Sequence, residues 1–333
     1  HMRAHIETAI LKYMPELAKT GEIPAGTLQG AALRRALDAL EHEEGEGPLT
    51  KDQKTVQEIT GDLRWMCRRV YRITNGSHKL ACVAHRAKCP EALQAAEGVL
   101  ASAWLARDEG QNYTKDAGEE TFSGVIKGTV DPRRGTSIKK ADTEAMKTQG
   151  APKELQGISD ATWSRGGEGS CDVYALALTI RGAAILVERK KSPIIAGSSA
   201  EMEGLALLKL SDKAIWARIV AAKLGFNVDS PTMLLCDAEA ALRAAMGEAS
   251  VARLKHAMRR AAIVRQRVAE EEVALCHVPD AANVVDIFTK WVKEEKFEQM
   301  LAYLNGTTKS GEGFTVMLLN LAQHYYDDRG SWA

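Results

Sequence analysis

The order of strand-like and helical segments between residues 155 and 306 most constrains how this chain can fold. Runs of strand length alternate with longer segments whose apolar residues recur every three to four positions. The expected strands are 155–160, 172–180, 184–189, 233–236 and 273–278, and the expected helices are 199–224, 238–247, 254–268 and 283–304. Three consecutive strands favour an antiparallel meander, and strands separated by helices favour parallel additions. We therefore expect an α/β fold with a mixed five-stranded sheet flanked by helices.

The rest of the chain differs in composition and in hydrophobic periodicity. Residues 3–108 are rich in Ala and Leu and are expected to be helical, with helices near 33–43, 51–70 and 90–107. Residues 109–153 are polar and aperiodic, which predicts a linker or insertion with a short strand within 121–130. Residues 154–306 form the α/β domain, 307–333 a C-terminal tail, and 1–2 are expected to be a cloning remnant.

Charge and hydropathy exclude some classes of protein. The chain holds 44 Lys and Arg against 44 Asp and Glu, so a strongly basic protein that coats nucleic acid is excluded, although local basic patches are not. Its apolar runs are shorter than the ~20 residues of a membrane helix, and no signal-peptide pattern opens it. Its 6 scattered cysteines suggest free thiols, and hence an intracellular protein of the cytoplasm or nucleus.

Four carboxylates occupy positions at which a metal site is expected. Asp160 and Asp237 end apolar strands, where a buried carboxylate needs a partner or a cation. Asp237 is alternatively the N-cap of the next helix. The spacing of Ser198 and Glu201 predicts a capping box, so Glu203, roughly 200° further around the helix, faces the sheet.

Asp286 completes the set in the first turn of the last helix, where it can alternatively serve the helix dipole. Four carboxylates at one sheet edge can hold two Mg²⁺ or Mn²⁺ ions about 4 Å apart, an arrangement suited to phosphodiester hydrolysis. Oxygen ligands favour these ions over zinc.

Several motifs within 154–306 resemble the ribonuclease H domain of copia-type retrotransposon polyproteins. Gly157-Ile-Ser-Asp-Ala-Thr-Trp163 resembles G-Y-S-D-A-D-W, Ser198-Ser-Ala-Glu-Met-Glu-Gly-Leu-Ala-Leu207 resembles S-T-A-E-A-E-Y-x-A-L, Leu234-Leu-Cys-Asp237 resembles L-x-C-D, and Val285-Asp-Ile-Phe-Thr-Lys290 resembles A-D-I-F-T-K. Residues 183–191 resemble A-I-S-W-K-S-K-K. The chain departs from the family at Val187 and Gly204, where Trp and Tyr are usual.

The resemblance implies a ribonuclease H-like fold and an endoribonuclease that cleaves the RNA strand of an RNA–DNA hybrid. The family's catalytic, metal-binding acids fall on Asp160, Glu203, Asp237 and Asp286, with Asp160 bridging two ions. An activated water then attacks phosphorus and leaves a 3′-hydroxyl. Residues 48–108, with Gly61-Asp-Leu-Arg-Trp65, resemble a reverse transcriptase thumb or connection, so a polymerase domain missing from this chain is a candidate partner.

A segment near the expected site, residues 253–267, contains Lys and Arg but no acidic residue. It predicts either a phosphate-binding surface or a solvated helix face. Its candidate nucleic-acid contacts are Arg253, Lys255, His256, Arg259, Arg260 and Arg265. His277 is a candidate for proton transfer, or an ordinary strand residue.

The alternative to an active nuclease is a catalytically inactive, domesticated nucleic-acid-binding or assembly module of the same fold.

Overall fold

The computed structural model describes residues 2–40, 50–84, 90–113, 125–126, 155–164, 172–180, 183–226, 228–247, 255–278 and 280–307. The chain divides into two compact units. The N-terminal unit comprises His1–Gly110 with Ser164–Ser170, and the C-terminal unit comprises Gln111–Trp163 with Cys171–Ala333. Arg253 of the predicted basic segment lies outside the described residues, as does the C-terminal tail.

Helices build the N-terminal unit, as its composition predicts. They are α1 (Met2–Tyr13), α2 (Pro15–Thr20), α3 (Gly30–Leu40), α4 (Lys51–Met66), the 3₁₀ turn η1 (Tyr71–Ile73), α5 (Thr74–Val83) and α6 (Pro90–Leu105). Helix α4 starts at a capping box in which Thr50 and Gln53 satisfy each other's backbone N–H groups. Its residues Ile59 and Leu63 are fully buried. Helix α6 contacts α1, α3, α4 and α5, so the helices of this unit pack around it.

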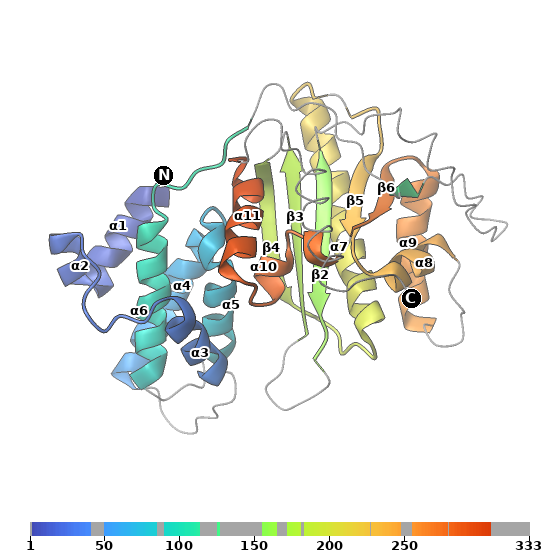
Figure 1. Cartoon of the computed structure of the whole chain (residues 1–333). Helices are drawn as coiled ribbons and strands as arrows, with labels where there is room; N and C mark the ends of the chain where they lie inside the picture. Colours follow the sequence, from blue (N-terminus) through green and yellow to red (C-terminus); the bar gives the residue numbers. More distant parts are fainter. Residues whose placement is uncertain are drawn as a thin grey trace. The chain divides into compact units, whose positions relative to one another are not determined.

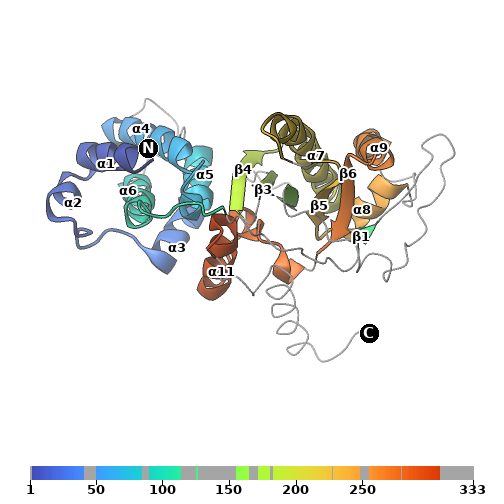
Figure 2. The ribbon, with the colours of Figure 1, turned by 90° about the horizontal axis from the view of Figure 1, so that it is seen from above.

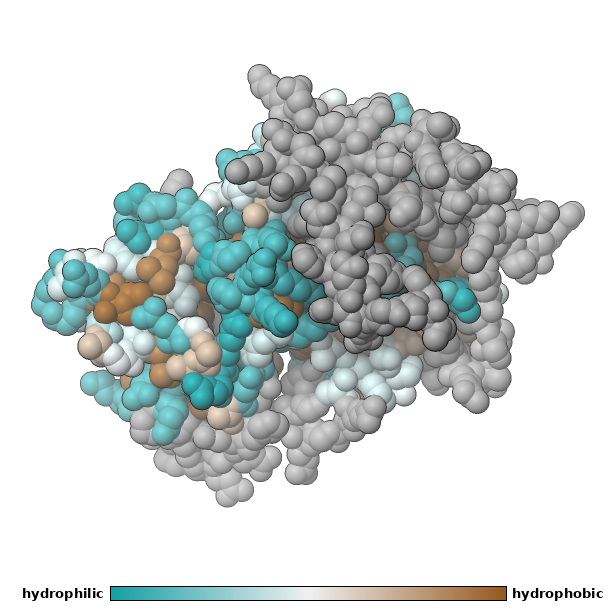
Figure 3. Space-filling view, in the orientation of Figure 1, coloured by the Kyte–Doolittle hydropathy of each residue, from teal (hydrophilic) through white to brown (hydrophobic). Residues whose placement is uncertain are grey.

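Some apolar atoms of the N-terminal unit also reach its surface, as the brown atoms in Figure 3 show. Its exposed large apolar residues are Leu11, Trp65 and Leu105. Isolated apolar residues are normal on protein surfaces, so they do not by themselves indicate a partner. Among the described helices, none combines the length and the hydropathy needed to span a bilayer.

A mixed sheet forms the centre of the C-terminal unit (Figure 1). Its strands are β1 (Val125–Ile126), β2 (Gln156–Thr162), β3 (Val173–Ile180), β4 (Ala183–Lys191), β5 (Thr232–Cys236) and β6 (Val273–His277), in the spatial order β1-β6-β5-β2-β3-β4. Strands β2, β3 and β4 form an antiparallel meander, and β5 and β6 add in parallel beside β2. The five expected strands are confirmed, and β1 adds a sixth at the edge, inside the segment 121–130.

Helices cover both faces of this sheet (Figures 1 and 2). Helices α7 (Ser199–Lys223), α8 (Glu239–Met246) and α9 (Lys255–Ala269) share one apolar core with β3, β5 and β6. Helix α10 (Asp286–Thr289) contacts β2 and β3, and α11 (Glu294–Asn305) contacts β4. Figure 2 shows α11 and α7 on opposite sides of the sheet.

The single helix expected over 283–304 is wrong. The chain instead forms a 3₁₀ turn, η3 (Asp280–Ala282), then the short α10, and then α11. Lys290 adopts an extended backbone with φ −138° and ends α10. The Asn283 amide donates to Ser159 O of β2 at 3.0 Å, which ties this segment to the sheet. This tertiary contact overrides the helical periodicity of the sequence.

Alternation along β2 decides which side chains face α7. Ser159 pairs with Leu176, whose side chain belongs to the core on the α7 side of the sheet. Asp160, the next residue, therefore points to the opposite face, where the Thr289 hydroxyl of α10 donates a hydrogen bond to it. Gly157 faces α7 at very close range, because an added Cβ would lie 2.8 Å from Leu210 Cδ1. A side chain at residue 157 would therefore push α7 away from β2.

We expect Gly157→Ala to lower the free energy of unfolding by about 1–3 kcal/mol through overpacking against Leu210. Gly204→Ala is the matched control, because no atom lies within 4 Å of a Cβ added at this helical position. This control should raise stability by roughly 0.5–1 kcal/mol. Urea unfolding measures both changes, and equal effects of the two substitutions would contradict the close packing of α7 on β2.

Candidate metal centre

Two neighbouring parallel strands bring the first two carboxylates together. Ser159 of β2 lies opposite Cys236 of β5, so the residues that follow, Asp160 and Asp237, lie at the same level of the sheet. Asp160 is 4% exposed. The helix N-cap after β5 is Ala238, and it makes no side-chain capping hydrogen bond. The alternative N-cap role of Asp237 is therefore wrong, which leaves this carboxylate available to the site.

Helix capping separates the two glutamates of α7. Ser198 Oγ accepts from the Glu201 N–H at 3.2 Å, and Glu201 Oε2 accepts from the Gly197 N–H at 3.0 Å. Glu201 Oε1 also lies 3.2 Å from Arg260 Nη1. Glu203 instead turns to the sheet, where its Oε1 accepts from the Ala161 N–H at 3.1 Å. The end of α7 thus presents Glu203 beside Asp160.

The segment around α10 supplies the fourth carboxylate. Asp286 is fully buried at the first residue of α10, and its Oδ2 lies 3.1 Å from both Lys290 Nζ and Lys296 Nζ. The Thr289 hydroxyl donates to Asp160 Oδ2 and so joins α10 to β2. Asn283, Thr289, Lys290 and Lys296 were not predicted as site residues, although Thr289 and Lys290 lie within a motif that resembles the family.

The four carboxylates fall into two overlapping groups that have Asp237 in common, and each group is compact enough to hold a cation. One ligand atom from each of Asp160, Asp237 and Asp286 lies within 4.8 Å of the others, and the same holds for Glu203, Cys236 and Asp237. Within the described part of the chain, Glu203 Oε2 and Asp286 Oδ1 are buried without a hydrogen-bond partner. Buried carboxylate oxygens are normally paired or bound to a cation. The residues present therefore fit a divalent ion with oxygen ligands.

Burial and mutual repulsion make these carboxyl groups weak acids in the metal-free chain. Burial, and then the charges of Asp160 and Asp237, raise the pKa of Glu203 to about 9. Burial, with Asp286 and Asp237 nearby, raises the pKa of Asp160 to about 7. Burial also raises the pKa of Asp286 to about 6, against the opposing effect of Lys290 and Lys296, and raises that of Asp237. A bound cation would relieve this repulsion.

The other predicted site residues lie around this cluster. His277 ends β6, is exposed, and places Nε2 3.0 Å from the Asp237 carbonyl oxygen. Of the basic segment, Lys255 and His256 belong to α9, but their side chains are not among those described. Arg259 is exposed, Arg260 pairs with Glu201, and Arg265 donates to the Ala244 and Ala245 carbonyls at the end of α8. Arg260 and Arg265 therefore also stabilise the fold.

Comparison with known proteins agrees with the motifs. No protein-family model matches the chain. A relative is the Retrovirus-related Pol polyprotein from transposon TNT 1-94 of Nicotiana tabacum, 26% identical over 149 residues, which are 45% of this chain. The chain spans only 11% of that polyprotein. The resemblance to copia-type retrotransposon polyproteins is thus confirmed.

Among solved structures, one match is the N-terminal ribonuclease H domain of rv2228c from Mycobacterium tuberculosis, fused to maltose binding protein. The two are 14% identical, with a TM-score of 0.30, over 44% of this chain and 96% of that one. The strand order and directions of the C-terminal unit confirm the predicted mixed sheet, in which an antiparallel meander is extended by two parallel strands and flanked by helices.

The raised pKa values predict that the metal-free protein loses stability as pH rises. In the unfolded chain these carboxyl groups ionise near pH 4. In the folded chain ionisation is delayed, up to a pKa of about 9 for Glu203. The stabilisation from their protonated forms is therefore complete below about pH 4 and is lost as pH rises towards 9.

We expect Glu203→Gln to raise the thermal midpoint of the EDTA-treated protein at pH 8 by a few degrees relative to the unsubstituted chain. The difference should shrink at pH 5, where Glu203 is already protonated. Excess Mg²⁺ or Mn²⁺ should stabilise the unsubstituted chain more than the variant. A midpoint difference that does not change with pH would contradict the buried, repelling cluster.

Proposed function

We propose that residues 154–306 act as a ribonuclease H that hydrolyses the RNA strand of RNA–DNA hybrids. The observation that carries this proposal is the convergence of Asp160, Glu203, Asp237 and Asp286, with two of their buried oxygens left without a hydrogen-bond partner among the described residues. The ribonuclease H-like sheet and the retrotransposon Pol relative support a nuclease of this type. In such an element, the activity removes template RNA during reverse transcription.

The proposed cofactor is a pair of Mg²⁺ or Mn²⁺ ions held by the four carboxylates. When bound, such ions activate an attacking water and stabilise the leaving oxygen of a phosphodiester. The chain's own residues hold the ligands in position: the Ala161 N–H orients Glu203, and the Thr289 hydroxyl orients Asp160. Lys290 and Lys296 both lie at Oδ2 of Asp286, which leaves Oδ1 of the same carboxylate for a cation.

The proposed substrate is a hybrid recognised by its shape. Groove width and 2′-hydroxyl groups distinguish RNA-containing duplexes without reference to sequence. The basic segment at α9 is proposed to contact backbone phosphates through Arg253, Lys255, His256, Arg259, Arg260 and Arg265. The exposed Arg259 supports this role most directly, because the guanidinium groups of Arg260 and Arg265 already bind protein groups.

Glu203→Gln should abolish cleavage of RNA in a labelled RNA–DNA hybrid, with a loss of at least about 10³-fold, because a ligand of the proposed metal site is removed. Glu201→Gln is the matched control on the same helix, since Glu201 serves the helix cap and Arg260. It should retain activity within about tenfold, because it loses only an ion pair and a cap. Gel analysis of hybrid cleavage in Mg²⁺ or Mn²⁺ measures both.

The same experiment with Asp237→Asn distinguishes an active nuclease from an inactive nucleic-acid-binding module. RNA cleavage that requires the hybrid, and that disappears in Asp237→Asn, supports the nuclease. Tight binding of the hybrid without cleavage in either metal would overturn the enzyme proposal and leave the inactive nucleic-acid-binding module. Equal cleavage by the unsubstituted chain and by both acid variants would indicate a contaminating nuclease.

His277 is proposed to assist proton transfer near the site. Its Nε2 lies 3.0 Å from the Asp237 carbonyl oxygen, and its side chain is exposed at the end of β6. His277→Ala should lower kcat by about 10²-fold with little change in KM if the imidazole transfers a proton in the rate-limiting step. Steady-state kinetics over a range of pH checks this, and an unchanged kcat with an unchanged pH profile would remove His277 from the mechanism.

A further inference from the structure

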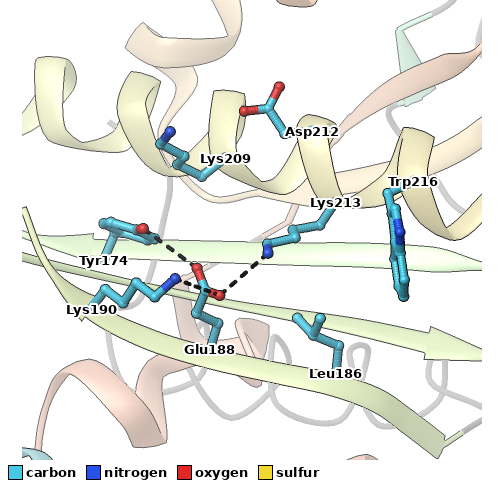
Figure 4. A pocket seen from close by; sticks show the side chains of 8 residues that line it. All are labelled: Tyr174, Leu186, Glu188, Lys190, Lys209, Asp212, Lys213 and Trp216. Atoms are coloured by element: carbon cyan, nitrogen blue, oxygen red, sulfur yellow. Dashed lines mark hydrogen bonds and ion pairs between the residues drawn. The ribbon is translucent and has the colours of Figure 1, made fainter.

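A groove lies between α7 and the edge strand β4, on the α7 side of the sheet (Figure 4). Its volume is about 440 Å³, and it is open to solvent. Residues of α7, β3 and β4 line it: Tyr174, Leu186, Glu188, Lys190, Lys209, Asp212, Lys213 and Trp216. In the figure Lys209, Lys190 and Tyr174 lie at one end, and Trp216 and Leu186 at the other. The groove therefore has a cationic end and an apolar, aromatic end.

A nearly buried glutamate holds two of the lysines in place. Glu188 Oε2 lies 2.9 Å from Lys190 Nζ and 3.6 Å from Lys213 Nζ, and its side chain is 15% exposed. The Tyr174 hydroxyl lies 3.5 Å from the other carboxylate oxygen. An ammonium group has three donors, so each lysine keeps donors for a further acceptor. Glu188 thus orients the two cations at the groove.

The remaining charges leave the groove positive. Asp212 is bonded by Arg267 at 2.8 Å, so its charge is offset outside the groove lining. Lys209 makes no ion pair with any residue of the described ranges. Three lysines and Arg267 then oppose two carboxylates, which leaves two positive charges in excess. A ligand with several negative charges is the chemistry that fits.

The groove starts close to the carboxylate cluster. Lys209 and Trp216 follow Glu203 on α7, and the helical rise places them ~9 Å and ~20 Å from it along the axis. Tyr174 pairs with Ala161, the neighbour of Asp160. Measured with the ~3.4 Å rise of a strand in a duplex, this span corresponds to roughly three to six nucleotides from the cluster, and to fewer nucleotides of an extended single strand. The cationic end faces the cluster, and Trp216 lies further away.

We propose that the groove binds single-stranded nucleic acid that extends beyond the hybrid. Backbone phosphates lie on Lys209, Lys213 and Lys190, and an unpaired base stacks on Trp216, which is 57% exposed. A positive groove with an aromatic platform is the usual arrangement for binding single strands. Bases inside a duplex already stack on each other, so the exposed indole favours an unpaired strand. The position of this strand relative to the cut rests on the proposed nuclease function.

The test is fluorescence anisotropy of labelled oligo-dT and oligo-rU with the full chain in EDTA, where cleavage does not contribute. Trp216→Ala should weaken binding at least fivefold, since base stacking is worth about 1–3 kcal/mol. The double variant Lys209→Gln, Lys213→Gln should also weaken it, and should reduce the slope of log K against log salt by about 1.4. Lys223→Gln, an exposed lysine at the far end of α7, is the control.

Four results would overturn the proposal. The first is no binding of either single strand, and the second is equal loss of affinity in Lys223→Gln and in the lysine double variant. The third is unchanged binding in Trp216→Ala with an unaltered thermal midpoint. Dimerisation of the chain that Trp216→Ala abolishes would assign the groove to protein contact instead. Single-strand binding without hybrid cleavage would overturn only the proposed nuclease function.

Discussion

The desolvation of four carboxylates at one sheet edge is the constraint on which the rest of the C-terminal unit depends. Burial alone raises the pKa of each of these acids, and their mutual charges raise the pKa of Asp160 and Glu203 further. Such a cluster is unfavourable in an apolar core unless the surrounding fold imposes it. A divalent cation would offset this cost, because Glu203 Oε2 and Asp286 Oδ1 have no hydrogen-bond partner among the residues that the structure describes.

Each carboxylate is fixed by a different structural device. Strand pairing places Asp160 beside Asp237, and the Ser198 cap orients α7 so that Glu203 and not Glu201 reaches the sheet. The Asn283 amide holds the chain that presents Asp286. Because β2 alternates, Asp160 faces α10 while its neighbours pack on α7. The site lies where these two faces meet at the end of the strand.

Local patterns were enough to predict the strands, the capping of α7 and the convergence of four acids. They failed where long-range contacts decide the structure. The helical periodicity of 283–304 gives no sign that Asn283 bonds Ser159 in β2, a contact across 124 positions. The basic run of α9 does not show that Arg260 and Arg265 bind Glu201 and the end of α8. The groove was missed for the same reason, since its residues come from three elements with no common motif.

The charge balance of the chain limits how it can attract nucleic acid. With 44 basic and 44 acidic residues, no general positive field draws a phosphate backbone to the surface. The carboxylate cluster by itself repels phosphates, so affinity must arise beside it from local cations. In the C-terminal unit many cations are engaged: Lys290 and Lys296 with Asp286, and Arg267 with Asp212. Lys209, which has no ion pair within the described part of the chain, and the two lysines held by Glu188 would then contribute most to the proposed binding. They add positive charge close to the cluster, although the chain as a whole is neutral.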